Sequence, residues 1–151
     1  MTHRRPSLRL SLTVPAELPQ LKFLTGMIER FLSDGAGIGP ERRDHQQLQL
    51  AVREVSSNVI RHAYKGSGAG PLRLQLRIVS RGVHIRIQDL GCPVPVAILR
   101  NCEEGPRRDP ADLAEGGYGL LLIREAVDRV AYREKNGVNS VYLYKEFLKA
   151  A

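Results

Sequence analysis

Three polar residues recur at one-turn intervals in the longest helical pattern of the sequence. They are Glu54, Asn58 and His62, and residues four apart lie on one face of an α-helix. Val55 and Val59 lie one step round the helix, so we expect the polar row to border the buried stripe. A glutamate can act as a general base, and an asparagine oxygen can bind Mg²⁺. Alone, such a row is more often a solvated helix face.

Two further motifs carry residues suited to binding a nucleotide. Asp89 and Gly91 end a strand pattern. A carboxylate there can accept a hydrogen bond from an exocyclic amine, and a glycine lets a flat ring approach the backbone. Residues 116–123 read GGYGLLLI, a glycine-rich turn that opens an apolar helix, where backbone N–H groups can bind phosphates. Each motif alone also fits an ordinary turn or hinge.

Hydrophobic periodicity predicts the elements that must position these groups. The order of elements is not a regular alternation of strand and helix, which argues against a doubly wound parallel sheet. Strands with one apolar face instead predict a two-layer α/β sandwich, with a mixed, mostly antiparallel sheet and helices on one face. The predicted elements are a strand at 8–14, helices at 17–32 and about 41–63 (the second opened by Pro40), a hairpin of 72–78 and 83–87, a loop at 93–115 with a short helix near 96–102, a helix at 119–128, and a hairpin of 130–135 and 140–148 around Asn136-Gly137.

Composition limits the class of protein. A chain of 151 residues fits one domain, 1–151. Its apolar runs fall short of the roughly 18 residues that span a bilayer, so we expect no membrane association. Cys92 and Cys102 match no zinc spacing, which favours a reduced, cytoplasmic protein.

The charge balance is basic. With 23 Lys and Arg against 16 Asp and Glu, the formal net charge is +7. This suggests an acidic or phosphate-bearing partner, although many basic domains are merely soluble. The chain has no Trp, three Phe and five Tyr, which disfavours a stacking platform for single-stranded nucleic acid. We therefore expect no direct nucleic-acid binding.

In combination, these motifs point to a family. Residues 50–64 read LAVREVSSNVIRHAY, followed by Asp89-x-Gly91, a variable loop and then Gly117-x-Gly119-Leu120. This set resembles the GHKL ATPase superfamily, which shares the Bergerat ATP-binding fold. Within it, the chain is most similar to the bacterial anti-sigma-factor serine/threonine kinases, whose second helix carries LAVxExxxNxxxHAY. The likeness runs from about residue 8 to residue 148.

The resemblance implies Mg²⁺ and ATP as cofactors and gives each residue of the helical row a role. Asn58 would coordinate the Mg²⁺ that bridges the ATP phosphates. Glu54 would be the general base that polarises a substrate hydroxyl or a water. His62 would line the phosphate side. Phosphoryl transfer needs a metal, a positioned acceptor and donors for the charged oxygens, and these groups supply several of them.

The same resemblance assigns the adenine pocket. Asp89 would recognise the adenine amino group, and Gly91 would lie beneath the ring. Ser140, in the last hairpin, matches a threonine that supports adenine binding through water. Leu90 departs from the family pattern, in which polar residues are common at that position.

The resemblance also implies two segments that would cover the ATP phosphates. Residues 92–115 would form the ATP lid. Gly117 and Gly119, followed by Leu120, would close over the phosphates. Instead of a serine or threonine for the γ-phosphate, the lid offers three arginines, Arg100, Arg107 and Arg108. These arginines would either stabilise the negative charge of the transition state of phosphoryl transfer or simply face solvent.

The function implied is that of an anti-sigma-factor-type kinase. It would phosphorylate an anti-sigma-antagonist (STAS-like) protein on another chain, with sequestration of a sigma factor and homodimer formation as further family properties. The alternative is an ATP-gated protein-binding module with negligible turnover. The presence of Glu54 favours the kinase, because a pure binder needs no base. A nucleic-acid binder driven by charge is the third interpretation.

Overall fold

Five strands form one sheet in the computed structural model, which describes residues 7–66, 70–93 and 118–147. The strand order is β1-β2-β3-β5-β4, and each neighbouring pair is antiparallel. The described sheet is therefore antiparallel throughout, where the sequence predicted a mixed, mostly antiparallel one. The strands are β1 (Arg9–Pro15), β2 (Pro71–Val79), β3 (Gly82–Asp89), β4 (Arg129–Lys135) and β5 (Val138–Glu146).

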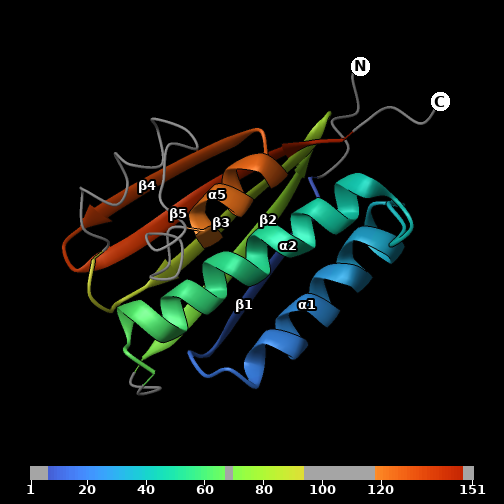
Figure 1. Cartoon of the computed structure of the whole chain (residues 1–151). Helices are drawn as coiled ribbons and strands as arrows, with labels where there is room; N and C mark the ends of the chain where they lie inside the picture. Colours follow the sequence, from blue (N-terminus) through green and yellow to red (C-terminus); the bar gives the residue numbers. More distant parts are fainter. Residues whose placement is uncertain (1–6, 67–69, 94–117, 148–151) are drawn as a thin grey trace.

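Three helices cover one face of this sheet, and Figure 1 shows α2 lying between α1 and α5 on that side. The helices are α1 (Gln20–Arg30), α2 (Arg43–Asn58) and α5 (Tyr118–Ala126). The predicted two-layer α/β sandwich with helices on one face is thus confirmed.

Strand alternation builds the core. On β2 and β3 every second side chain points to the helices, as the period of two requires. Leu74 pairs with Ile87, and both are fully buried, as are Leu24 from α1 and Val52 from α2. Burying apolar area on this scale is the main stabilising contribution to folding.

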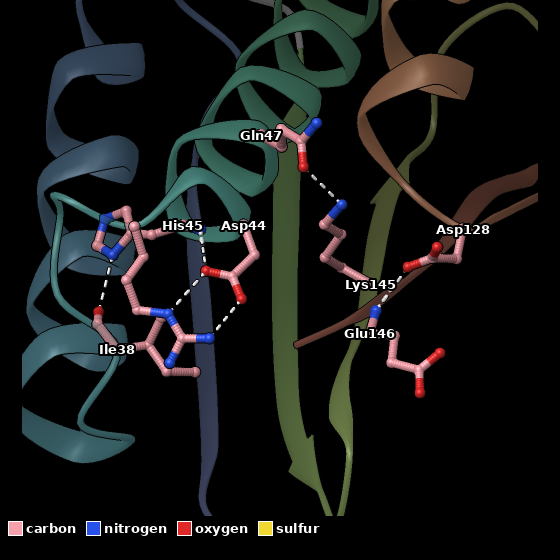
Figure 2. A network of polar contacts seen from close by, with 8 residues as sticks. Ile38, Asp44, His45, Gln47, Asp128, Lys145 and Glu146 are labelled. Carbon is pink, nitrogen blue, oxygen red and sulfur yellow. Dashed lines mark hydrogen bonds and ion pairs between the residues drawn. The ribbon is translucent and has the colours of Figure 1, made fainter. Parts of the chain in front are cut away.

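The connection between α1 and α2 differs from the prediction. The helix begins at Arg43 rather than near Pro40, because Arg42 is extended (φ −77°, ψ 138°) and its N–H closes a turn on the Gly39 carbonyl at 3.1 Å. The Arg42 guanidinium then holds buried Asp44 at 2.7 and 3.1 Å. Figure 2 shows Asp44 also accepting from the His45 N–H at 3.0 Å.

Two further contacts in Figure 2 fasten the end of β5 to the helical layer. The amino group of buried Lys145 donates to Gln47 Oε1 on α2 at 2.7 Å. The Glu146 N–H donates to the Asp128 carboxylate at 2.6 Å. The first contact lies near the start of α2, the end opposite Tyr64, and the second joins β5 to the segment between α5 and β4.

The last hairpin follows its predicted turn. Asn136 and Gly137 have positive φ values of 54° and 79°, as a tight Asn-Gly hairpin turn requires. The turn fixes the register between β4 and β5, with Lys135 opposite Val138. This register decides which residues of β5 face the helices.

Candidate functional site

Asp89, at the end of β3, is the centre of a buried polar cluster. It lies in register with Asn139 on β5. Asn139 Nδ2 donates to Asp89 Oδ1 at 2.8 Å and to the Gly91 carbonyl at 2.9 Å. The Gly91 N–H donates to the same Oδ1 at 2.9 Å. Oδ1 thus has two donors, while Oδ2 makes no hydrogen bond to any other residue that the structure describes.

Asn139 is itself held in one orientation. The Tyr132 hydroxyl on β4 donates to Asn139 Oδ1 at 3.0 Å. This fixes the amide with Nδ2 toward the Asp89 carboxylate. Burial raises the pKa of Asp89, and the hydrogen bonds from Asn139 and Gly91 oppose that rise. The cluster therefore presents one oriented carboxylate oxygen, Asp89 Oδ2, in a largely desolvated environment.

Tyr64 joins the C-terminal end of the helical layer to the turn after β3. Its hydroxyl accepts from the Leu90 N–H at 2.7 Å and donates to the Pro71 carbonyl at 2.8 Å. Burial raises the pKa of Tyr64; the Leu90 hydrogen bond opposes this, and the Asp89 charge adds to it. Sequence reasoning quoted Tyr64 within a motif but gave it no role.

Gly91 has a structural requirement of its own. A Cβ at this position would lie 2.4 Å from the Ala63 carbonyl oxygen, and the next residue, Cys92, donates its N–H to that same oxygen at 2.8 Å. The backbone thus passes too close to the end of the helix for any side chain. This structural requirement is separate from the predicted role of Gly91 beneath an adenine ring, which stays a prediction.

The helical row divides at the end of α2. Glu54 and Asn58 are half-buried and His62 is exposed. The helix continues as a π-helical turn, Val59–Ala63, whose five-residue closure changes the rotation per residue. His62 therefore departs from the regular α-helical row. None of the three side chains hydrogen-bonds to another described residue, so the oxygens of Glu54 and Asn58 remain available to a ligand.

The side-chain oxygens of the helical row could bind Mg²⁺ only if phosphate oxygens supplied further ligands. Among the described residues, no group of three or more His, Cys, Asp or Glu side chains is placed to hold a metal. Mg²⁺ usually keeps several waters and is bound by one or two protein oxygens plus substrate phosphates. The half-buried Asn58 can provide one such oxygen, and Glu54 lies one helical turn before it.

Ser140 does not reach this site. It pairs with Gln88, and its Oγ lies 3.1 Å from the Gln88 side-chain amide. Neighbouring strand residues point to opposite faces, so Ser140 lies on the sheet face away from Asp89. The residue that contacts Asp89 is Asn139, one position earlier. The signal that could have found it is the Asn136-Gly137 turn, which sets the register of β5.

The remaining predicted residues are only partly described. Gly119 and Leu120 lie in the first turn of α5, which packs on α2. Cys92 is exposed as a free thiol. Outside the described residues lie Gly117, most of the expected lid, the expected short helix at 96–102, Cys102 and the arginines Arg100, Arg107 and Arg108.

The fold and this site belong to a known class. The sequence matches the histidine kinase-like ATPase domain family over residues 14–145, and the chain belongs to that family. Among its curated relatives is the serine-protein kinase RsbW of Halalkalibacterium halodurans, 29% identical over 130 residues that cover 83% of this chain and 78% of the relative. RsbW of Listeria innocua is 28% identical over 136 residues, covering 88% and 84%. The GHKL assignment is thereby confirmed, and the similarity to anti-sigma-factor kinases that the sequence indicated is seen again in these relatives.

Solved structures agree on the fold. The chain superimposes on the RsbU and RsbW domains of a Mycobacterium tuberculosis protein with a TM-score of 0.65 at 16% identity, covering 95% of this chain and 33% of that one. The SiaB–SiaC complex from Pseudomonas aeruginosa gives the same TM-score and identity, with 93% and 90% covered. In the part of the chain with described coordinates, no helix is long and apolar enough to cross a membrane.

Proposed function

We propose that this chain is an ATP-dependent protein serine/threonine kinase of the anti-sigma-factor type. The observation that carries the proposal is the buried Asp89 carboxylate, whose Oδ1 is held by Asn139 and Gly91 while Oδ2 has no partner among the described residues. Family membership and the RsbW relatives support it.

Asp89 would select adenine. Oδ2 accepts a hydrogen bond from the exocyclic amino group of the base. A guanine placed the same way would present its carbonyl oxygen to the carboxylate, two acceptors facing each other. The locked Asn139 amide keeps Oδ2 oriented, so little ordering remains to be done on binding.

The half-buried oxygens of α2 would serve the phosphates. Asn58 contributes a ligand to Mg²⁺, which when bound neutralises charge on the phosphate oxygens. Glu54 accepts the proton of a substrate serine hydroxyl as that oxygen forms its bond to the γ-phosphorus. The bond from the γ-phosphorus to the bridging oxygen breaks, and ADP leaves.

The substrate of this kinase would be an anti-sigma-antagonist protein of the STAS-like class. This part rests on the RsbW relatives. Sequestration of a sigma factor and formation of a homodimer belong to the same proposal. The second candidate remains an ATP-gated binding module, in which ATP changes partner affinity without being consumed. The half-buried, unengaged Glu54 favours the kinase.

The two candidates separate in a transfer assay. The full chain is incubated with Mg·ATP labelled at the γ-phosphate and with proteins that co-purify with it. We expect label on a partner serine, and a loss of transfer of about 10²- to 10⁴-fold in Glu54→Gln with ATP affinity retained. The control is Glu29→Gln, at an exposed position of α1. If ATP alters partner binding but no label moves, the binding module is the function.

A further inference from the structure

The sheet face turned away from the helices carries seven of the 23 Lys and Arg residues of the chain and almost no acidic residue. We call it the open face, since Figure 1 shows the three helices on the other side. Within the described strands its only acidic residue is Glu146, so its formal charge is +6 against +7 for the whole chain. Its basic residues are Arg9, Arg73, Arg77, Arg86, Arg129, Arg133 and Lys135, all exposed.

Register places two like charges opposite each other on the open face, Arg9 and Arg77. Arg77 also lies opposite His84, whose ring feels the surrounding positive charge. Burial lowers the pKa of His84, and Arg77 and Arg129 lower it further. Like charges directly opposite each other in a sheet destabilise it. A bound polyanion would relieve this repulsion.

Two tyrosines lie among these cations. Tyr142 and Tyr144 both belong to the open face of β5. The Arg86 guanidinium lies 5.6 Å from the Tyr142 ring centroid, and that of Arg129 lies 5.8 Å from the Tyr144 ring centroid. Nucleic-acid bases stack on aromatic rings and on guanidinium planes. The sequence total of aromatics was low, but the fold brings two of them to the basic face.

The other side chains of the open face indicate the kind of partner. Apart from Pro15, Pro71, Val79 and Val138 at strand ends, they are small or polar, such as Thr13, Gln75 and Ala131. The face therefore lacks the apolar patch that forms the core of many protein interfaces, and a second copy would oppose two faces of like charge. Arginine, serine, threonine, glutamine and tyrosine are, in contrast, the usual ligands of backbone phosphates.

We propose that the open face binds single-stranded nucleic acid, with its arginines on the phosphates and with bases stacked on Tyr142 and Tyr144. A sheet face that carries an exposed ring, Tyr142, and a half-buried one, Tyr144, suits unpaired bases, whereas duplex grooves take an inserted helix or ribbon. The sequence alone had placed this interpretation third. It is independent of the nucleotide site, because Asp89 faces the helical side.

The test is fluorescence anisotropy with a labelled oligothymidylate about 20 nucleotides long, repeated with an oligouridylate to compare DNA with RNA. We expect the logarithm of the binding constant to fall linearly with the logarithm of the salt concentration, with a slope of about 0.7 per phosphate contact. The triple variant Arg73→Gln/Arg77→Gln/Arg133→Gln should reduce that slope by about 2 and the affinity at least tenfold. The matched control is Lys22→Gln/Arg43→Gln/Arg53→Gln, with the same charge change on exposed positions of the helical layer.

Circular dichroism serves to check that both triple variants are folded. The variant Tyr142→Leu is a second test, which removes an aromatic ring without changing the net charge. Losing one base stack should weaken binding about fivefold or more. Equal loss in the control variant overturns the proposal, since the binding is then bulk charge. So does displacement by Mg·ATP, which would place the oligonucleotide in the nucleotide site. Displacement by polyglutamate at equal charge would identify an acidic protein as the partner instead.

Discussion

Asn139 donates a 2.8 Å hydrogen bond from Nδ2 to Oδ1 of Asp89, across the pair of strands β3 and β5. Tyr132 fixes the Asn139 amide from the other side. This relationship leaves the second carboxylate oxygen of Asp89 as the acceptor for a ligand. The nucleotide site proposed for this chain depends on that oxygen.

Asp89→Asn should weaken ATP binding about tenfold to a hundredfold. The amide oxygen of the new side chain would keep the bonds from Asn139 and Gly91, which turns its NH₂ group to the Oδ2 position. Two donors then face each other where adenine binds, and a hydrogen bond to a charged group, about 1.5–3 kcal/mol, is lost. Titration calorimetry with Mg·ATP measures the effect. Asp34→Asn, at an exposed carboxylate, should bind as the wild type does; unchanged affinity in Asp89→Asn would remove Asp89 from the site.

A matched pair on β5 separates the two faces of the sheet. Asn139→Ala should destabilise the protein by about 1–3 kcal/mol, because a buried carboxylate loses its donor, and should lower ATP affinity. Ser140→Ala should leave ATP affinity unchanged, since Ser140 contacts Gln88 on the opposite face. Urea unfolding and nucleotide titration measure both quantities. Reduced ATP binding in Ser140→Ala, with Asn139→Ala unaffected, would restore the role that the sequence gave to Ser140.

The stability of the protein should depend on the ionisation of Asp89. Its pKa in the folded protein is raised from 3.8 by burial, so the folded state binds its proton more tightly than the unfolded state does. As pH rises from about 3.8 through the folded pKa, the unfolded state loses its proton first and stability falls. The free energy of unfolding of Asp89→Asn relative to wild type should therefore increase across this window. If the difference in free energy of unfolding between Asp89→Asn and wild type stays constant with pH, then the pKa of Asp89 is the same in the folded and unfolded states.

Asn58→Ala should weaken ATP binding only where Mg²⁺ is present. Asn58 is half-buried, and its oxygen, proposed as a metal ligand, accepts no hydrogen bond from the described residues, so its loss should leave the fold intact. The affinities for ATP are compared with Mg²⁺ and with EDTA, and we expect the advantage given by Mg²⁺ to shrink at least tenfold. Equal weakening under both conditions would make Asn58 a direct ligand of the nucleotide instead.

Tyr64→Phe should reduce the free energy of unfolding by about 1–3 kcal/mol. The substitution leaves the Leu90 N–H and the Pro71 carbonyl without their shared partner, and unpaired buried groups carry that cost. Tyr142→Phe, on the open face, is the control and should lie within about 0.5 kcal/mol of wild type. Equal effects of the two substitutions would mean that the Tyr64 hydroxyl contributes nothing specific.

Local patterns were enough to predict the strands and helices, and the two short turns were enough to predict the two hairpins. Alternating apolar residues identified the strands, and Asn136-Gly137 identified the final hairpin, because both signals lie within a few residues of what they determine. Glu54, Asn58 and Asp89 were singled out by spacing within short motifs. Their proposed roles still depend on the tests above.

What the sequence did not predict depends on contacts between distant segments. The hydrogen bond that the Leu90 N–H donates to Tyr64, and the approach of Gly91 to Ala63, join the π-helical turn after α2 to the turn after β3. The choice of Asn139 over Ser140 turns on a one-residue register, which exchanges the two faces of a strand. The net charge of +7 likewise did not reveal that the fold gathers most of it on one face of the sheet.

The most direct test of the nucleotide site is a crystal structure of the chain with Mg²⁺ and a non-hydrolysable ATP analogue. The account predicts that the adenine amino nitrogen lies within hydrogen-bonding distance of Asp89 Oδ2, while Asn139 Nδ2 keeps its bond to Oδ1. It also predicts Mg²⁺ bound to the oxygen of Asn58. An adenine bound elsewhere, or an Asp89 carboxylate that contacts no part of the nucleotide, would contradict it.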